Sequence, residues 1–297
     1  MSELPRIPIR RTMDNRSGLD MIGETVPDLE ANLTEAGVYV DDETGQPVVA
    51  YAPFPGDFAE FRRALIDTPM STTLRGAGMR NVSRTFGFSP KSVVLKRESC
   101  RPASLAYDNP QSHAVIVSAA RTMDVWLRSE LPEVVDYSNA QSEAISDEWR
   151  LSDDVYWTSG VVNQDSALPY HRDRNNFPVW SAMPVARRSA RGGYLSIPEY
   201  DVTIAARDGW VVYFNGYELT HGVTPINIVA DDGYRYSCVY YCLRGMVNCA
   251  DDAREQARAR QVRTDRERSM ASASKEDLRA KITGRATGGS GGVVPTR

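Results

Sequence analysis

The spacing of hydrophobic residues along the chain changes near residue 150. In the first half, two segments repeat apolar residues every three or four positions, as one face of an α-helix does. The first segment is residues 57–66, in which Phe58, Phe61 and Leu65 share a face. The second begins after Ser112, which we assign as its N-cap, and ends before Pro132. The apolar stripe of this second helix consists of Val115, Ile116, Ala119, Met123, Trp126 and Leu127.

The second half instead carries short runs rich in β-branched and aromatic residues, separated by Gly, Pro, Asp and Asn. These runs are residues 155–163, 192–198, 201–206, 210–216 and 234–243, and an earlier run occupies 47–51. Residues 71–92, which are rich in Ser, Thr, Gly and Arg, are expected to form a loop. Strands of this length and spacing are typical of a β-barrel or sandwich. Helices followed by strands predict an α+β fold rather than alternating βαβ units.

Composition divides the chain into three parts. Residues 1–46 are polar and predict an N-terminal arm with little core of its own. Residues 47–250 hold both predicted helices and all predicted strands, and we interpret them as one domain. Residues 251–297 are charged and rich in Ala and Arg, which predicts an exposed helix followed by a disordered end, TGGSGGVVPTR.

Charge, apolar runs and cysteine spacing limit the cellular locations and the binding partners that we expect for this protein. The 297 residues carry a net charge of −4, so nucleic acid would have to meet a local basic patch or the basic tail. No apolar run is long enough for a transmembrane helix, and the N-terminus lacks the apolar region of a secretory signal. We therefore expect a cytoplasmic protein with no membrane partner. The cysteines lack paired spacing, which predicts free thiols at Cys100, Cys238, Cys242 and Cys249.

Two of the three histidines lie in a pattern with chemical meaning. His171 and Asp173 are two residues apart, so on a strand both side chains would point to the same side. His221 follows the strong strand signal of residues 210–216. Two imidazoles and one carboxylate form the facial triad of non-haem Fe(II) oxygenases, which leaves positions open for a bidentate co-substrate and O₂. The third histidine, His113, begins a predicted helix, and we assign it a structural or surface role.

An arginine after the second histidine completes the pattern. Arg235 opens the predicted strand 234–243, on which Arg235, Ser237, Val239 and Tyr241 share one face. A buried guanidinium there can bind the distal carboxylate of 2-oxoglutarate through two hydrogen bonds, and Ser237 can add its hydroxyl. Each residue alone has an ordinary structural explanation. The ordered set predicts an iron site with a co-substrate pocket.

Two motifs containing these residues resemble the TET/JBP family of 5-methylpyrimidine oxygenases. HRDRNN (171–176) is similar to the segment around that family's first two iron ligands, and RYSCVYY (235–241) is similar to its strand after the distal histidine. The resemblance covers roughly 150–245. It implies a double-stranded β-helix core (jelly-roll, cupin-like) with flanking helices. It also implies hydroxylation of the C5-methyl group of a pyrimidine in DNA, with 5-methylcytosine favoured and thymine as the other target.

The resemblance assigns further residues to substrate binding. Asn176 would read the edge of the target base, and Tyr241 would stack on the base after it is flipped out of the duplex. Apart from the resemblance, the arginines near the iron motif are candidates for phosphate contacts, namely Arg172, Arg187 and Arg188, and an ordinary solvated loop is the alternative interpretation.

Two departures from animal members point to a compact microbial or phage-type member, located in the host cytoplasm if phage-encoded. Leu243 stands where those members have a base-reading histidine, and the chain cannot build their cysteine-rich zinc region.

Three alternatives remain open. The first alternative is an AlkB-type repair enzyme. Those enzymes place a second arginine six residues after the first, and Tyr241 at that position counts against this alternative. The same metal chemistry could act on a free nucleotide, a peptide or another small molecule, which the acidic body favours. An inactive barrel that binds nucleic acid would not need all four residues of the iron and co-substrate pattern.

Overall fold

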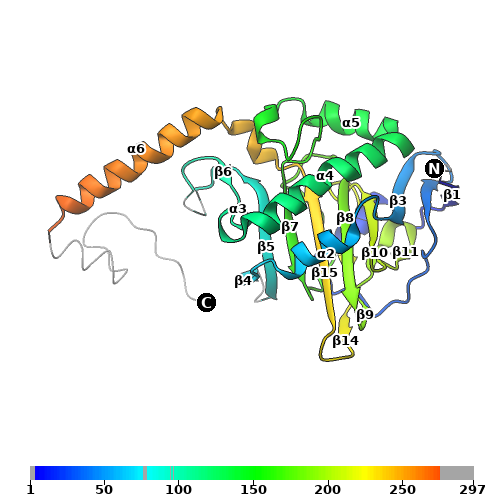
Figure 1. Cartoon of the computed structure of the whole chain (residues 1–297). Helices are drawn as coiled ribbons and strands as arrows, with labels where there is room; N and C mark the ends of the chain where they lie inside the picture. The colour runs from blue at the N-terminus through cyan, green and yellow to red at the C-terminus, as the bar shows by residue number, and fades with distance from the viewer. Residues whose placement is uncertain (1–3, 76–78, 94, 96, 275–297) are drawn as a thin grey trace.

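The computed structural model describes residues 4–75, 79–93, 95 and 97–274. Its centre is a ten-stranded sheet in which strands far apart in the sequence lie side by side (Figure 1). Its order is β1 (Arg6–Ile9), β2 (Gly37–Asp41), β3 (Pro47–Pro53), β12 (Trp210–Phe214), β8 (Ser181–Arg188), β15 (Tyr234–Tyr241), β7 (Ser159–Gln164), β5 (Met79–Ser89) and β4 (Ser71–Arg75), with β6 (Arg101–Pro102) paired to β5.

A smaller antiparallel sheet packs against one face of the large sheet. It contains β11 (Val202–Ile204), β10 (Leu195–Ile197) and β13 (Gly222–Val223), and a separate pair joins β9 (Ala190–Gly192) to β14 (Ile226–Ile228). Strand alternation divides the core in two. In β12, Val212 and Phe214 pack with the small sheet, whereas Val211 and Tyr213 pack on the opposite side. The two facing sheets form the predicted double-stranded β-helix.

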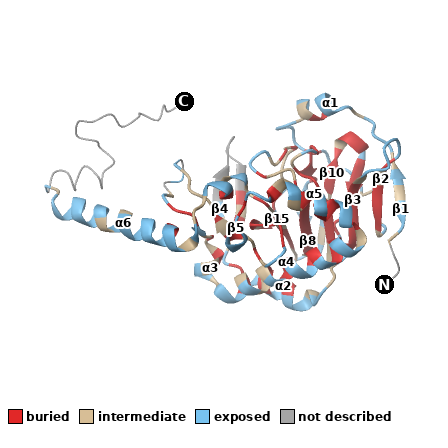
Figure 2. Ribbon diagram, turned by 90° about the horizontal axis from the view of Figure 1, so that it is seen from above, coloured by how far each residue is buried: buried red, intermediate tan, exposed pale blue. Residues whose placement is uncertain are grey.

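Helices cover the opposite face of the large sheet (Figures 1 and 2). They are α2 (Phe58–Ile66), α3 (Leu105–Asp108), α4 (Pro110–Glu130) and α5 (Pro132–Ser142). The prediction of α2 is confirmed, and Asp57 caps it by accepting from two backbone N–H groups. The predicted cap of α4 was wrong. Asn109 accepts a hydrogen bond from the backbone N–H of Ser112, and Pro110 occupies the first turn, where its missing N–H costs nothing.

The prediction that the second helix ends before Pro132 is confirmed, because α4 ends at Glu130. Pro132 then begins a further helix, α5, which the sequence analysis did not predict. A second prediction for the first half is corrected. Residues 71–92 are mainly strands β4 and β5, not a loop. Their polar composition hid the strands, because β5 buries polar side chains such as Asn81 and Ser83 beside β7.

The N-terminal segment joins the large sheet. The boundary expected at residue 46 falls in the β2–β3 hairpin, and β1 pairs in parallel with β2. Val38 and Tyr39 are buried in the two halves of the core. Short helices α1 (Asn15–Asp20), η2 (Asp147–Trp149), η3 (Pro198–Tyr200) and η4 (Arg244–Asn248) lie in the connections.

The C-terminal region contains the predicted exposed helix and an unexpected covalent bond. Helix α6 (Asp252–Ala271) extends away from the body, with Glu255 as its one buried residue (Figure 1). The end predicted to be disordered lies outside the described residues. The prediction of four free thiols was wrong, because Cys100 and Cys249 form a disulfide. Cys238 and Cys242 are free and buried. Among the described residues, no helix has the length and apolar character needed to cross a membrane.

Candidate active site

Three candidate metal ligands converge where two chain segments meet at the edge of the small sheet. His171 and His221 form an isolated antiparallel bridge, with backbone N···O distances of 2.8 and 3.0 Å. The Nε2 atoms of His171 and His221 each lie 3.9 Å from one carboxylate oxygen of Asp173. Each residue offers a ligand atom within 4.8 Å of the other two.

The local structure that aims Asp173 differs from the prediction. The residues after His171 form a turn rather than a regular strand. The backbone N–H of Asp173 donates to the carbonyl oxygen of Gly216 at 2.8 Å, which fixes the carboxylate beside both imidazoles. The convergence therefore comes from this turn and not from strand alternation.

Both imidazoles are prepared to bind a cation through Nε2. The Nδ1 atom of His171 lies 2.8 Å from the carbonyl oxygen of Pro169, and that of His221 lies 3.0 Å from the carbonyl of Leu219. A carbonyl only accepts, so each Nδ1 carries the hydrogen and each Nε2 keeps its lone pair. Burial and the neighbouring His171 hold the pKa of His221 well below its usual value. Neutral imidazoles and a carboxylate fit a divalent metal such as Fe(II).

A cavity of about 360 Å³ opens beside these three residues. Strand β15 contributes Ser237, Val239 and Tyr241 to one wall, as the predicted alternation requires. The outer part is lined by Asn176 and Leu243, which form a backbone bridge. The structure thus brings the candidate iron ligands, Ser237, Asn176 and Tyr241 to one cavity.

The guanidinium of Arg235 is fully buried next to the cavity-lining Ser237, to whose Oγ its Nη1 donates at 3.3 Å. Its Nε and Nη2 have no hydrogen-bond partner among the described residues. Burial, together with the nearby Arg187, lowers the pKa of Arg235 to about 9. A buried cation with unused donors is costly unless an anion pairs with it. This part of the site therefore fits a carboxylate.

Gly193 makes room for this guanidinium. Its φ of +68° lies in the left-handed region, and a Cβ there would come within 2.5 Å of Arg235 Nε.

Arg172 lines the cavity, but its guanidinium is bonded inside the protein. Its Nη2 lies 2.8 Å from Glu199 Oε1 in a fully buried ion pair, and its Nε donates to Thr220 Oγ1 at 2.9 Å. The same Glu199 oxygen accepts the backbone N–H of Thr220 at 2.8 Å. Arg172 precedes Asp173 and Thr220 precedes His221, so this pair holds the two ligand-bearing segments together. The side chain of Arg172 is thus already bonded inside the protein, and its expected phosphate contact stays a prediction.

Arg187 and Arg188 lie away from the cavity, and their expected phosphate contacts stay predictions. Arg187 donates to the backbone carbonyls of Ala190 and Gly192 and is partly buried. Arg188 is exposed and pairs with Asp232 at 3.0 Å, next to the first residues of β15. Tyr241 ends that strand, roughly 20 Å away at 3.3 Å per residue. Neither arginine lines the cavity.

Asn163 is a cavity residue that the sequence analysis did not single out. It lies opposite Ser237 in the β7–β15 register and is 4% exposed. Its Oδ1 is buried without a hydrogen-bond partner among the described residues. Strand alternation within residues 155–163 could have placed Val161 and Asn163 on one face, but it could not have shown that the face lines a cavity.

Comparisons with known proteins agree with this architecture. No protein-family model matches the chain, and no curated protein matches it in sequence. The solved structure of NgTET1 in complex with 5mC DNA is 15% identical, with a TM-score of 0.54, and the match covers 80% of this chain and 94% of that one. A 2OG-Fe(II) oxygenase from Burkholderia pseudomallei is 13% identical, with a TM-score of 0.39 and coverage of 65% and 82%. OsALKBH1 is 11% identical, with a TM-score of 0.41 and coverage of 66% and 98%.

The chain has the double-stranded β-helix fold of the 2-oxoglutarate and Fe(II) oxygenases. Its centre carries a His-Asp-His set suited to ferrous iron. The structural match that carries weight is to NgTET1, and at 15% identity it shows the fold alone.

Proposed function

We propose that this protein is an Fe(II)- and 2-oxoglutarate-dependent dioxygenase that hydroxylates the C5-methyl group of a pyrimidine in DNA, with 5-methylcytosine favoured over thymine. One observation carries the proposal. A fully buried guanidinium with two unused nitrogens lies beside a cavity that also holds two histidines and an aspartate with converging ligand atoms. An iron site alone would not need the buried cation, and Arg235 is the arginine in which two buried nitrogens, Nε and Nη2, lack a partner among the described residues.

The protein's own residues would bind and orient the co-substrate. Arg235 would pair with the distal carboxylate of 2-oxoglutarate, and Ser237 and Asn163 would direct it along the wall formed by β15 and β7. His171, Asp173 and His221 would hold iron, and residues 47–250 would form the catalytic domain. When bound, Fe(II) supplies oxidative decarboxylation of 2-oxoglutarate by O₂ and transfer of one oxygen atom to a C–H bond.

The outer part of the cavity would receive the base. Tyr241 offers a ring for stacking, and the Asn176 amide can pair with a base edge. A base in a duplex must first leave the stack to reach such a site, at a cost of about a few kcal/mol. Support comes from the two TET/JBP-like motifs and from the likeness to the NgTET1 structure, which was solved with 5mC DNA.

A second candidate keeps the chemistry but takes a free nucleotide or another small molecule. Arg172 and Arg187, which were expected to contact phosphates, are bonded inside the protein. The body is also acidic, since the whole chain carries −4 and the residues after 250 are basic. Fewer phosphate contacts favour a smaller anionic substrate.

The test measures succinate release by the full chain reconstituted with Fe(II). Matched substrates are a methylated duplex, the same duplex without methyl groups, a methylated single strand and the free nucleoside. Mass spectrometry of the nucleosides identifies the oxidised base. We expect methyl-dependent succinate and a hydroxymethyl pyrimidine from DNA. Turnover of the nucleoside alone would replace the first candidate by the second, and no coupled turnover with any substrate would contradict both.

A further inference from the structure

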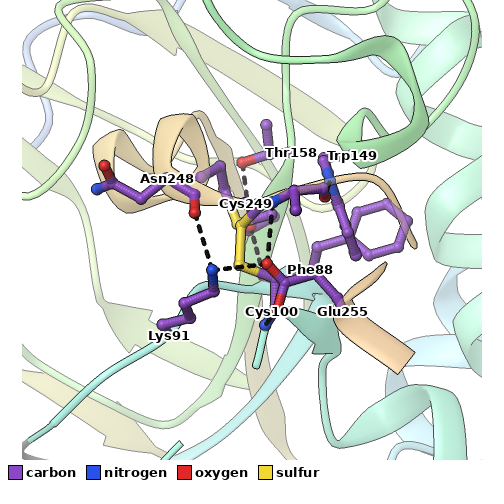
Figure 3. The surroundings of a disulfide bond; sticks show 11 residues. Phe88, Lys91, Cys100, Trp149, Thr158, Asn248, Cys249 and Glu255 are labelled. Carbon is purple, nitrogen blue, oxygen red and sulfur yellow. Dashed lines mark hydrogen bonds and ion pairs between the residues drawn. A yellow bond between two sulfur atoms is a disulfide. The ribbon is translucent and has the colours of Figure 1, made fainter. Parts of the chain in front are cut away.

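The disulfide between Cys100 and Cys249 ties the region before β6 to the chain just beyond the candidate active site (Figure 3). The two residues are 149 positions apart. Cys249 follows helix η4, which itself follows β15 and the cavity residues Tyr241 and Leu243. We call residues 242–249 the rim segment.

The rim segment is part of the outer cavity wall. The backbone N–H of Phe177 donates to the carbonyl of Cys242 at 2.8 Å, and that of Arg244 donates to the carbonyl of Asn175 at 3.1 Å. Asn176 and Leu243 form the backbone bridge between these two bonds. A movement of the rim segment would therefore move Asn176.

A buried carboxylate holds the same junction (Figure 3). Glu255, 1% exposed, accepts the backbone N–H of Cys100 at 3.0 Å and that of Ala250 at 2.9 Å. Lys91 lies 2.7 Å from the Glu255 carboxylate and donates to the carbonyl of Asn248 at 3.2 Å. These contacts form only while both segments lie together, so the disulfide and the polar contacts support each other.

The disulfide lies beside a cleft. A cleft of about 670 Å³ between the core and the start of α6 is lined by Cys100, Trp149 and Arg263, and Cys249 is partly exposed. The other two thiols are poorly suited to exchange. Burial raises the pKa of Cys242 to about 12 and that of Cys238 further above its usual range, and exchange needs a thiolate.

We infer that the Cys100–Cys249 disulfide is a reducible lock on the rim segment, and that a dithiol reductant releases the rim and weakens substrate binding. One thiolate of the dithiol attacks the Cys249 sulfur, the S–S bond breaks, and the Cys100 thiolate leaves and takes up a proton. The second thiol of the reductant then displaces Cys249, which also becomes a thiol. Two electrons pass from the dithiol, which ends as a disulfide. The identity of the substrate rests on the proposed function, whereas the release of the rim does not.

The experiment compares the oxidised full chain with the same protein after dithiothreitol treatment and desalting. Fe(II) and 2-oxoglutarate are present without oxygen, so that nothing turns over. Hydrogen exchange is measured at residues 242–249, and the Kd is measured for a fluorescent methylated duplex. We expect faster exchange in the rim segment and a Kd raised about fivefold or more, which is the lower end of typical coupling between sites. Binding of 2-oxoglutarate, measured separately, should not change.

Matched variants isolate the bond. Cys249→Ser and Cys100→Ser should each behave like the reduced protein and stop responding to dithiothreitol. Comparing the two redox states of the unmodified chain keeps the test valid if a variant folds poorly. Native alkylation should label Cys100 and Cys249 only after reduction, and labelling before reduction would overturn the inference. Unchanged rim exchange or an unchanged duplex Kd after reduction would do the same. Absence of 2-oxoglutarate binding in both states would instead overturn the proposed function.

Discussion

The inner and outer parts of the candidate site are held in different ways. The inner part, around Arg235 and the three candidate ligands, is fixed by backbone bonds between the two ligand-bearing segments and by the buried Arg172–Glu199 ion pair that joins them. The outer part, around Asn176, Tyr241 and Leu243, is fixed by backbone bonds to the rim segment, which a disulfide anchors. A rigid inner part suits chemistry that needs fixed geometry. The outer part depends on loops, where substrate selectivity commonly resides.

Removing a metal ligand would break the inner part most severely. Asp173→Ala leaves two imidazoles without the carboxylate that both face at 3.9 Å. We expect loss of iron retention and turnover below detection, since the carboxylate is one of three protein ligands. Metal content after desalting and succinate release measure this. Asp232→Ala removes an exposed carboxylate at the far end of β15 and serves as the control. Normal iron content in Asp173→Ala would contradict the assignment.

Replacing Arg235 tests the co-substrate half without touching the metal. Arg235→Met removes a buried charge whose Nε and Nη2 are free to bind an anion. Each hydrogen bond to a charged group contributes about 1.5–3 kcal/mol, so we expect the KM for 2-oxoglutarate to rise roughly a hundredfold. Iron retention should persist. Arg188→Met, on a strand paired with β15 but exposed, should leave the KM unchanged. An unaltered KM in Arg235→Met would exclude its assigned role.

These two predictions use residues that were identified from the sequence alone. The chain has only three histidines, and the spacing of two of them relative to Asp173 and Arg235 left few other interpretations. Fold class followed from strand length and order. Helix α5 was missed. Strands β4 and β5 were missed as well, because polar residues such as Ser83 become buried only through pairing with the distant strand β7.

Arginine roles and the disulfide could not be predicted for a related reason. Arg172 lies in a site motif and Arg187 lies close to one, but their partners are Glu199 and the carbonyls of Ala190 and Gly192 in β9, and the sequence does not show these contacts. Cys100 and Cys249 are 149 residues apart, and no local spacing connects them. The sequence shows how many charged groups and thiols the chain contains. Which arginine pairs with which acceptor, and which cysteines form a disulfide, depends on the tertiary structure.

The buried ion pair between Arg172 and Glu199 offers a sharper test of the inner part. Glu199→Gln leaves the Arg172 charge buried without its partner, which should cost about 3–5 kcal/mol of unfolding free energy. Because the pair joins both ligand-bearing segments, iron affinity should fall as well. Denaturant unfolding and metal titration measure the two effects. The double variant Arg172→Met with Glu199→Gln should recover part of the stability. Equal loss in the single and double variants would show that the charge is not the cause.

Truncating the stacking ring tests the outer part. Tyr241→Ala removes the cavity-wall ring that we assign to the flipped base. Stacking of a base on an aromatic ring contributes about 1–3 kcal/mol, so we expect the KM for methylated DNA to rise roughly tenfold. Tyr241→Phe keeps the ring and should behave like the unmodified protein. The KM for 2-oxoglutarate should stay constant in both variants. A shift in that KM would instead place Tyr241 in the inner part.

The smallest expected effect is a pH dependence of 2-oxoglutarate binding, which concerns the inner part of the site alone. In the free protein the pKa of Arg235 is lowered to about 9 by burial, and a bound carboxylate would raise it again. Below pH 9 the free protein already carries the charged guanidinium, so the affinity for 2-oxoglutarate is at its maximum. Above pH 9 the free protein must take up a proton to bind, and the Kd therefore rises by at most about tenfold per pH unit. The Kd for 2-oxoglutarate, measured from pH 7.5 to about 10.5, gives this profile. Arg235→Met should bind weakly at every pH without the break, because the titrating group is gone. A Kd that does not change with pH in the unmodified chain would mean that water reaches the Arg235 guanidinium. The inner part of the site would then be as accessible to solvent as the rim segment.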